Sequence, residues 1–144
     1  MNDKITANGE YHIEGFSIDS GKKVFDRTYH NVVCQNFFNQ LFKALGNQAS
    51  ILDVLSFATG TGVSAAQKSD TSLENEQFRK GITQITSDSM QIKVITQLDP
   101  FESNFIIKEI GLFFSDGGIM SRASTNIDKN SSTKYNITYT LTVV

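Results

Sequence analysis

The sequence ends with Tyr135-Asn136-Ile137-Thr138-Tyr139-Thr140-Leu141-Thr142-Val143-Val144, and these residues carry its clearest structural pattern. Large apolar or aromatic residues stand at the odd positions up to 143, and Asn or Thr stands at the even positions up to 142. Successive side chains of a β-strand point to opposite faces, so this alternation predicts an antiparallel strand with one buried face and one solvated face. The segment has no charge and no Pro, so either an inner position in a sheet or a neighbouring subunit must protect it. We expect it to be part of the folded domain and not a tail.

Further strand-like segments precede it, separated by turn residues. Residues 10–18 alternate with a slip near Gly15, which indicates a bulge or a change of face. Asp19-Ser20-Gly21 is a turn, and residues 22–30 are the expected hairpin partner, with Val24 and Phe25 facing inward. Other strands are expected at residues 51–59, 81–86, 90–99, 105–114 and 119–124. Residues 105–114 form the most apolar run and are expected to be a central strand. The hairpin turn Ser115-Asp116-Gly117-Gly118 follows this strand, and a polar loop is expected at residues 126–133.

One helix is predicted at residues 32–45. Its apolar residues recur at helical spacing: Phe37, Phe38, Leu41, Phe42 and Leu45. Asn31 can cap its start, and Gly46-Asn47 suits a left-handed stop. We expect the wide apolar face to lie against a sheet, with a groove for a partner as the alternative. The pattern as a whole predicts a mainly β chain, an antiparallel β-sandwich (jelly-roll-like) with one main helix, in a single domain spanning residues 1–144.

Composition limits the function classes. The chain has 144 residues, 39% of them hydrophobic, and a net charge of -2, so it can bury a core. It has no Lys/Arg cluster, Lys22-Lys23 being a solvated turn flank, and this argues against nucleic-acid binding. No stretch approaches the ~20 apolar residues of a membrane-spanning helix. The polar start Met1-Asn2-Asp3-Lys4 does not resemble a signal peptide, so we expect synthesis in a cytoplasm.

Candidate chemical motifs are weak. Cys34 is the single Cys and has apolar neighbours, which indicates a buried residue, and His12 and His30 have no motif that would make either one its base. Gly60-Thr61-Gly62 lacks the further Gly or the Gly-Lys-Ser/Thr of a phosphate loop, so it is better explained as a tight strand exit. The carboxylates of Asp70, Glu74 and Glu76 do not follow the spacing of a calcium loop. We therefore expect no catalysis, no cofactor and no metal.

Glu109 lies within the most apolar segment and must face solvent or be paired, because a lone buried charge is costly. Arg79 is the predicted partner, in an ion pair that would pin the loop 70–79 onto the sheet. Residues 71–78 are expected to form one or two helical turns capped by Ser69 or Asp70, which would also allow a local pair between Glu76 and Arg79.

Three signatures in order are similar to a family of small tailed-bacteriophage virion proteins with a GTG, a DTxLxxExxR and an EIGLF pattern. They are Gly60-Thr61-Gly62, then Asp70-Thr71-Ser72-Leu73-Glu74-Asn75-Glu76-Gln77-Phe78-Arg79, then Glu109-Ile110-Gly111-Leu112-Phe113. The resemblance covers residues 31–144. Ser64-Ala65-Ala66 stands where that family often has a Pro, and residues 1–30, outside the match, are either a docking hairpin or two further strands. The hypothesis gives structural roles to the following residues: Gly60, Gly62, Asp70, Arg79, Glu109 and Gly111.

The resemblance implies a non-enzymatic structural component of the virion, assembled in the host cytoplasm. It would be an adaptor module of the tail or fibre apparatus, present in several copies, with neighbouring virion proteins and other copies of itself as partners, in a trimer or another closed ring. The alternatives are a head-fibre or capsid decoration protein, and a receptor- or glycan-binding tip with Phe101 and Tyr29 as candidate contact residues.

Overall fold

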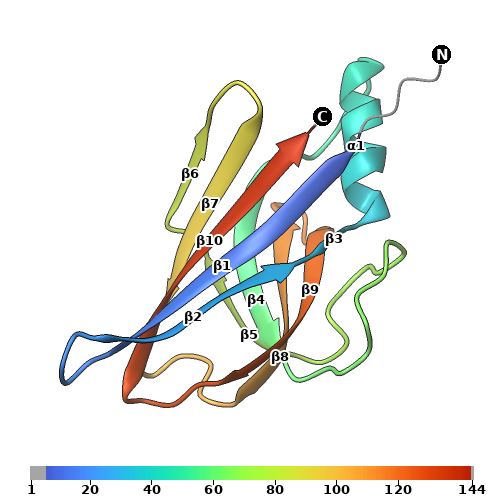
Figure 1. Cartoon of the computed structure of the whole chain (residues 1–144). Coiled ribbons are helices and arrows are strands. Elements are labelled where there is room, and N and C mark those ends of the chain that lie inside the picture. Colours follow the sequence, from blue (N-terminus) through green and yellow to red (C-terminus); the bar gives the residue numbers. More distant parts are fainter. Residues whose placement is uncertain (1–5, 144) are drawn as a thin grey trace.

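A computed structural model gives the fold of the chain and describes residues 6–143. Two five-stranded antiparallel sheets pack face to face, and one helix lies at one end (Figure 1). The first sheet has the order β2-β1-β10-β7-β6, and the second has the order β3-β9-β8-β4-β5. The elements are β1 Ala7–Ser17, β2 Lys23–His30, β3 Val32–Val33, α1 Gln35–Leu45, β4 Val54–Gly60, β5 Glu76–Gly81, β6 Gln84–Ser87, β7 Gln91–Leu98, β8 Ile106–Phe114, β9 Ile119–Asp128 and β10 Thr133–Val143. The prediction of a mainly β sandwich with one helix is confirmed.

The terminal strand β10 occupies the middle of the first sheet, between β1 and β7. Tyr139 lies opposite Tyr11 on one side and Val94 on the other. The odd-numbered side chains from Tyr135 to Leu141 are buried, as the alternation predicts. Of the two ways to protect this strand, the chain uses the inner position; Val144 lies outside the described residues.

The core lies between the two sheets and is completed by two tyrosines from the first sheet. The rings of Tyr11 and Tyr139 are 4.7 Å apart, and both side chains are fully buried. The Tyr11 hydroxyl is hydrogen-bonded to the Ser121 hydroxyl of β9 at 2.7 Å, and Asn31 Nδ2 donates to the Tyr139 hydroxyl at 2.9 Å. Each ring therefore contributes apolar area to the core while its polar end has a partner.

The helix α1 begins later than predicted. Val32 and Val33 pair with β9 as the short strand β3, so the first helical residue is Gln35. Asn31 is not the cap, since its side chain contacts Tyr139; Cys34 occupies the cap position without a side-chain hydrogen bond.

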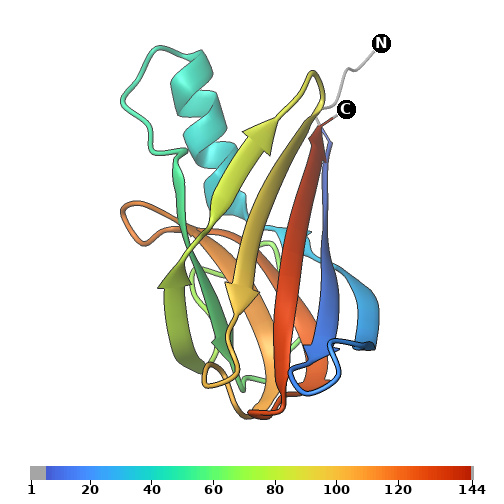
Figure 2. The same cartoon turned by 90° about the vertical axis from the view of Figure 1, so that its left-hand side faces the viewer.

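The end of α1 also differs from the prediction. Asn47 has the positive φ of 58°, whereas Gly46 has a φ of -88°. Phe37 is buried, but Phe42 is 55% exposed and Leu45 is 64% exposed. The helix lies beyond the end of the second sheet, at the level of the strand ends of the first sheet (Figure 2). The expectation that the whole apolar face lies against a sheet is wrong for the second half of the helix.

The first hairpin is confirmed over the described residues 6–30. Strands β1 and β2 pair with a register shift between Gly15 and Phe16, as the slip in the alternation indicates. Phe25 packs edge-on against Tyr135 at 5.6 Å, whereas Val24 is exposed, so the prediction for Val24 is wrong. The part of the expected docking hairpin at residues 1–5 lies outside the described residues.

The middle of the chain crosses between the sheets. The strand predicted at residues 81–86 does not form as one element: Gly81 ends β5, an edge of the second sheet, and residues 84–86 belong to β6, an edge of the first. The helical turns predicted at residues 71–78 are wrong, because that segment forms loop and then β5. The strand β9 runs to Asp128, four residues beyond the predicted end and into the expected polar loop. Within residues 6–143, no helix is both long enough and apolar enough to cross a membrane.

Candidate functional site

The long loop at residues 61–75 connects β4 to β5 and covers the face of the second sheet that is turned away from the first sheet (Figure 1). Leu73 is its apolar anchor, and this side chain is buried. It joins a small second core on that face: Cys34, Ala58, Leu73, Phe113 and Ile119. The loop is thus packed against the sheet through Leu73, and polar contacts to Glu109 and Arg122 hold it there as well.

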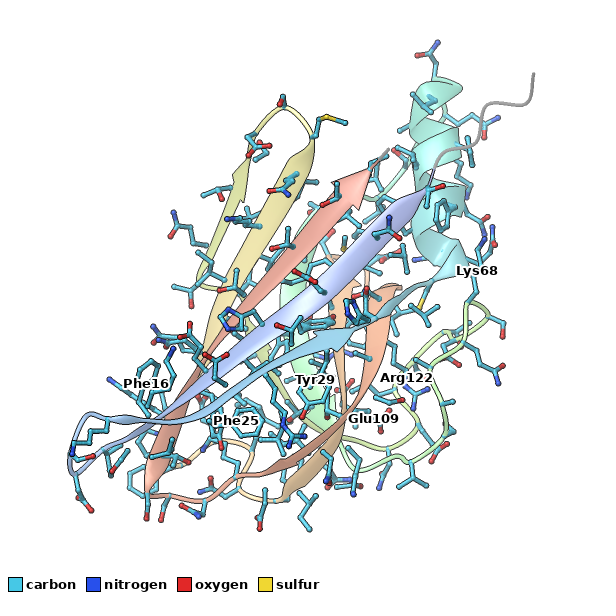
Figure 3. All side chains as sticks on the ribbon, viewed as in Figure 1. Phe16, Phe25, Tyr29, Lys68, Glu109 and Arg122 are labelled. Carbon is cyan, nitrogen blue, oxygen red and sulfur yellow. The ribbon has the colours of Figure 1, made fainter. Side chains whose placement is uncertain are left out.

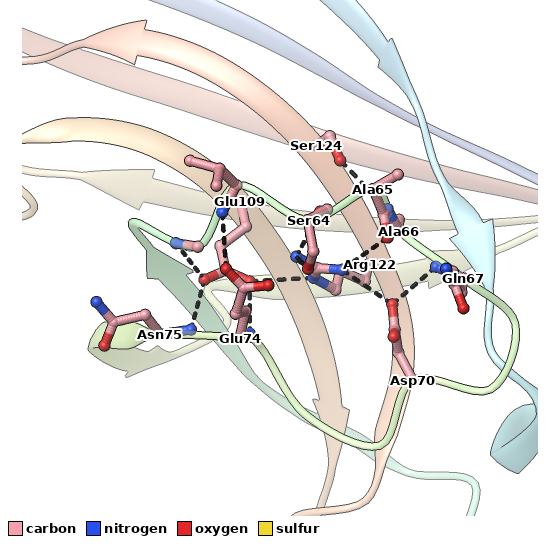
Figure 4. Close-up of polar contacts among 12 residues, drawn as sticks. Ser64, Ala65, Ala66, Gln67, Asp70, Glu74, Asn75, Glu109, Arg122 and Ser124 are labelled. Carbon is pink, nitrogen blue, oxygen red and sulfur yellow. Dashed lines mark hydrogen bonds and ion pairs between the residues drawn. The ribbon is translucent and has the colours of Figure 1, made fainter.

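Glu109 projects from β8 beneath this loop and is fully buried. Its Oε2 accepts hydrogen bonds from the backbone N–H groups of Gly62 at 2.7 Å and Asn75 at 2.8 Å. Its Oε1 accepts from the backbone N–H of Glu74 at 2.8 Å and from Arg122 Nε at 3.0 Å (Figure 4). One carboxylate therefore ties both ends of the loop to the centre of the sheet.

Arg122 lies beside Glu109 on the neighbouring strand β9, and its side chain is only 2% exposed (Figure 3). Its Nη1 donates to Asp70 Oδ2 at 3.0 Å and to the Ala65 carbonyl at 3.3 Å, and its Nη2 donates to the carbonyl and hydroxyl of Ser64. These bonds, with the one to Glu109, use all the N–H donors of a guanidinium. Burial acts to lower the pKa of Arg122, but the hydrogen bonds to Asp70 and Glu109 outweigh it and the pKa lies above its ordinary value.

The predicted ion pair between Arg79 and Glu109 is wrong. Arg79 lies on β5 and pairs instead with Glu76, through Nη2–Oε1 at 2.6 Å, a local contact that forms although the segment is a strand and not a helix. Its guanidinium also lies over the Phe113 ring, 3.8 Å from the centroid. Arg79 therefore covers the second core from the edge, while Arg122 neutralises Glu109.

Arg122 was not predicted as the partner of Glu109, because it lies outside the Asp70–Arg79 signature. The strands β8 and β9 form a hairpin, and its observed register explains the pair. Arg122 lies opposite Gly111, and Glu109 lies opposite Ser124, so Arg122 and Glu109 are diagonal neighbours on one face. The register shifts by one residue between Leu112 and Phe113, so an even count back from the Gly117-Gly118 turn would place Arg122 opposite Ile110, on the other face of the sheet, and no sequence signal marks the pair.

The signature glycines are sites of close approach. A Cβ on Gly62 would collide with Glu109 Oε2 and with the Cβ of Glu74. A Cβ on Gly60 would lie 2.7 Å from the same Glu109 oxygen, and one on Gly111 would lie 3.0 Å from Leu73 Cδ2. The glycines let the loop reach the carboxylate and let Leu73 reach the sheet, and this supports their predicted structural roles.

The chemistry available at this cluster is that of a structural anchor. Each Glu109 oxygen already accepts two hydrogen bonds, one of them from the guanidinium of Arg122. Cys34 is fully buried near the loop, and burial raises the pKa of its thiol to about 12, so the reactive thiolate is disfavoured at neutral pH.

A surface cluster on the first hairpin resembles a metal site in its residue types. His12, Glu14 and Asp26 form the one group of three potential metal ligands within residues 6–143. Lys23 Nζ already contacts Glu14 at 2.6 Å and Asp26 at 3.1 Å. The hydrogen bonds from His12 and then Lys23 lower the pKa of Asp26. An ammonium group in this position repels a metal cation, so we interpret the cluster as a surface ion-pair network.

The two aromatic residues proposed for a receptor-binding tip have different environments. Tyr29 on β2 is half-buried, and its hydroxyl donates to the Asn126 carbonyl at 3.4 Å (Figure 3). Phe101 lies on the loop between β7 and β8 and is 87% exposed. Only Phe101 is free to contact a partner.

Comparison with known proteins finds no matching family model, no matching curated protein and no matching solved structure. The fold and the site define the chain as a β-sandwich whose longest loop is anchored to the sheet by a buried ion pair.

Proposed function

We propose that this chain is a non-enzymatic structural component of a tailed-bacteriophage particle, an assembly or adaptor module of the tail or fibre apparatus present in several copies. One observation carries the proposal. The three sequence signatures that resemble the virion family meet in one buried network, in which Glu109 contacts Gly62, Glu74 and Asn75. The residues behind the resemblance are thus the ones that hold the loop on the sheet.

The energetic character of this network suits a structural module. Buried charges cost free energy unless they are paired and hydrogen-bonded, and here Glu109, Arg122 and Asp70 satisfy one another. The polar groups are directed inward, toward the loop backbone, and away from any substrate. A fixed outer surface is useful to a part that must fit its neighbours in an assembly, whereas a catalyst needs polar groups that can reach a substrate.

A second candidate, a receptor- or glycan-binding tip, is favoured by Phe101. Exposed aromatic rings on loops bind partners. Recognition of a sugar also requires placed polar groups around the ring, and the side chains of Glu102 and Asn104 near Phe101 already have hydrogen-bond partners within the protein. We therefore rank this candidate second.

The experiment is quantitative mass spectrometry of gradient-purified particles from cells in which the genome encoding this chain is replicating. We expect the chain to co-purify with tail proteins at several copies per particle, in a salt-resistant manner. Recovery of the chain only from the particle-free supernatant would overturn the proposal. A host-encoded soluble control protein, added to the same gradient, measures carry-over.

A further inference from the structure

The loop between β7 and β8 presents a large apolar side chain to solvent. Phe101 is 87% exposed, more than any other large hydrophobic residue in residues 6–143. The loop lies at the end of the sandwich opposite α1 (Figures 1 and 2). A single exposed apolar residue needs no explanation by itself. The contacts that hold this loop in one conformation are what suggest a role for Phe101.

A buried lysine holds the loop from inside. Lys129 is 2% exposed, and its Nζ donates to the Asp99 carbonyl at 2.9 Å, to the Pro100 carbonyl at 3.4 Å and to Asn104 Oδ1 at 2.9 Å. Burial lowers the pKa of this ammonium group, with the opposing charges of nearby acidic residues acting against the shift. The chain thus buries a cation, at a cost, to fix the backbone on either side of Phe101.

Further contacts fix the rest of the loop. Glu102 accepts from Lys80 Nζ at 2.7 Å and from the Asp99 backbone N–H at 2.8 Å. Ser103 has a φ of 55°, in the left-handed region that non-glycine residues rarely adopt, and its hydroxyl is hydrogen-bonded to Thr59 at 2.8 Å. Strained residues persist where the surroundings hold them and cluster at binding sites. The loop is therefore preorganised with Phe101 pointing outward.

A groove near α1, at the other end of the molecule, has apolar side chains in its walls that could contact a phenyl ring. It has a volume of about 470 Å³ and lies between the start of β1 and α1, with Val33, Phe38 and Phe42 among its walls. Lys68 also lines it, with Nζ 4.7 Å from the centre of the Phe38 ring (Figure 3). Phe42, from the exposed second half of α1, contributes to the wall of this groove.

We propose that Phe101 of one copy of this chain inserts into the α1 groove of the next copy, an inference that rests on the proposed role as a multi-copy assembly module. Asp99, two residues before Phe101, is exposed, whereas Glu102 is already paired with Lys80; the groove carries Lys68, so Asp99 and Lys68 make the two surfaces complementary in charge. A second copy suits the site better than a glycan, since Lys80, Glu102, Asn104 and Lys129 are already bonded within the loop. The Phe101 loop and the α1 groove are different surfaces, so the contact between two copies is head-to-tail. Repetition of this contact forms a ring if the rotation from copy to copy returns to the first one, and a filament if it does not.

The test is sedimentation velocity of the full chain over about a hundredfold range of concentration. We expect the wild type to associate with increasing concentration. We expect Phe101→Ala and Phe42→Ala each to weaken association at least about tenfold. The melting temperature should be unchanged for Phe101→Ala, whose side chain is 87% exposed, and only slightly lower for Phe42→Ala, whose side chain is 55% exposed. Val63→Ala is the matched control, since Val63 is also exposed and apolar but belongs to neither surface; it should associate as the wild type does.

Mixing gives a sharper readout. The Phe101→Ala chain keeps an intact groove, and the Phe42→Ala chain keeps an intact Phe101 loop. An equimolar mixture of the two should therefore form dimers and no larger species, while each variant alone stays monomeric. A wild type that is monomeric throughout, or a Phe101→Ala chain that associates like the wild type, would overturn the inference. Glycan binding by a monomeric wild type, lost in Phe101→Ala, would also overturn it in favour of the tip function. None of these results depends on particle content, so the proposed function fails or survives separately, by mass spectrometry.

Discussion

Replacement of Glu109 by Gln tests the loop anchor with a nearly isosteric change. The carboxylate accepts two hydrogen bonds at each oxygen, from Gly62 and Asn75 at Oε2 and from Glu74 and Arg122 at Oε1. A Gln side chain offers one acceptor oxygen and one NH2 group. In either orientation the NH2 group faces two N–H donors, so two buried donors lose their acceptor. The substitution also leaves Arg122 with Asp70 as its one remaining anionic partner in the cluster.

The magnitude follows from these losses. Each unsatisfied buried donor costs about 1–3 kcal/mol, and breaking a buried ion pair by changing one partner costs about 3–5 kcal/mol in total. We expect Glu109→Gln to lower the free energy of unfolding by about 4 kcal/mol. At about 3 °C per kcal/mol for a chain of this size, the melting temperature should fall by about 12 °C.

The assay is urea-induced and thermal unfolding followed by circular dichroism, with Glu76→Gln as the matched control. Glu76 forms its ion pair with Arg79 at the surface, where both side chains are about one-third exposed. Exposed pairs contribute about 0–1 kcal/mol, so the control should unfold close to the wild type. A melting temperature for Glu109→Gln within about 2 °C of the control would refute the account of the anchor.

Three further outcomes are expected. Gly62→Ala should destabilise the chain by about 1–3 kcal/mol because its Cβ collides with Glu109 and Glu74, whereas Gly81→Ala, with its nearest neighbour 3.9 Å away, should be close to neutral; equal unfolding midpoints for the two variants would contradict this. Burial raises the pKa of Cys34 to about 12 from its ordinary value of 9.0, so the stability from this thiol is fully present below pH 9 and is lost as the pH rises toward 12. Above pH 9 the wild type should therefore lose stability more steeply than Cys34→Ala, by about 1.4 kcal/mol per pH unit, and parallel pH profiles would show that the thiol does not contribute. Truncation after Thr138 removes the buried Tyr139 and Leu141 from a central strand and should abolish folding; a truncated chain with a cooperative thermal transition would contradict the assigned role of β10.

The strands could be predicted where the alternation was regular and local. The terminal strand was predicted with its buried face because a period of two leaves one choice of face once a sheet is assumed. The helix boundaries were less predictable. Val32 and Val33 suit either a helix or a strand, and only their pairing with Arg122 and Ser121 of β9, which is distant in the sequence, selects the strand.

The candidate site was predicted in part. The residues of the anchor were recognised at Gly60, Gly62, Asp70 and Glu109, since a carboxylate within an apolar strand requires a partner. The partner was assigned wrongly because the β8–β9 register, which shifts between Leu112 and Phe113, is not apparent from the sequence. Arg79 was chosen because it belongs to the Asp70–Arg79 signature, whereas Arg122 reaches Glu109 through the β8–β9 register. The Lys129 contacts to the β7–β8 loop depend on packing between segments about 30 residues apart, and no motif announces them.

Cryo-electron microscopy of purified particles, at a resolution that shows side chains, would examine the proposed role itself. The account predicts symmetry-related copies of this sandwich in the tail or fibre apparatus, each with the loop 61–75 closed over Glu109 and Arg122, and with Phe101 of one copy in the α1 groove of its neighbour. Particles that are complete and infectious without density for the chain, from a preparation in which mass spectrometry also fails to detect it, would contradict the account.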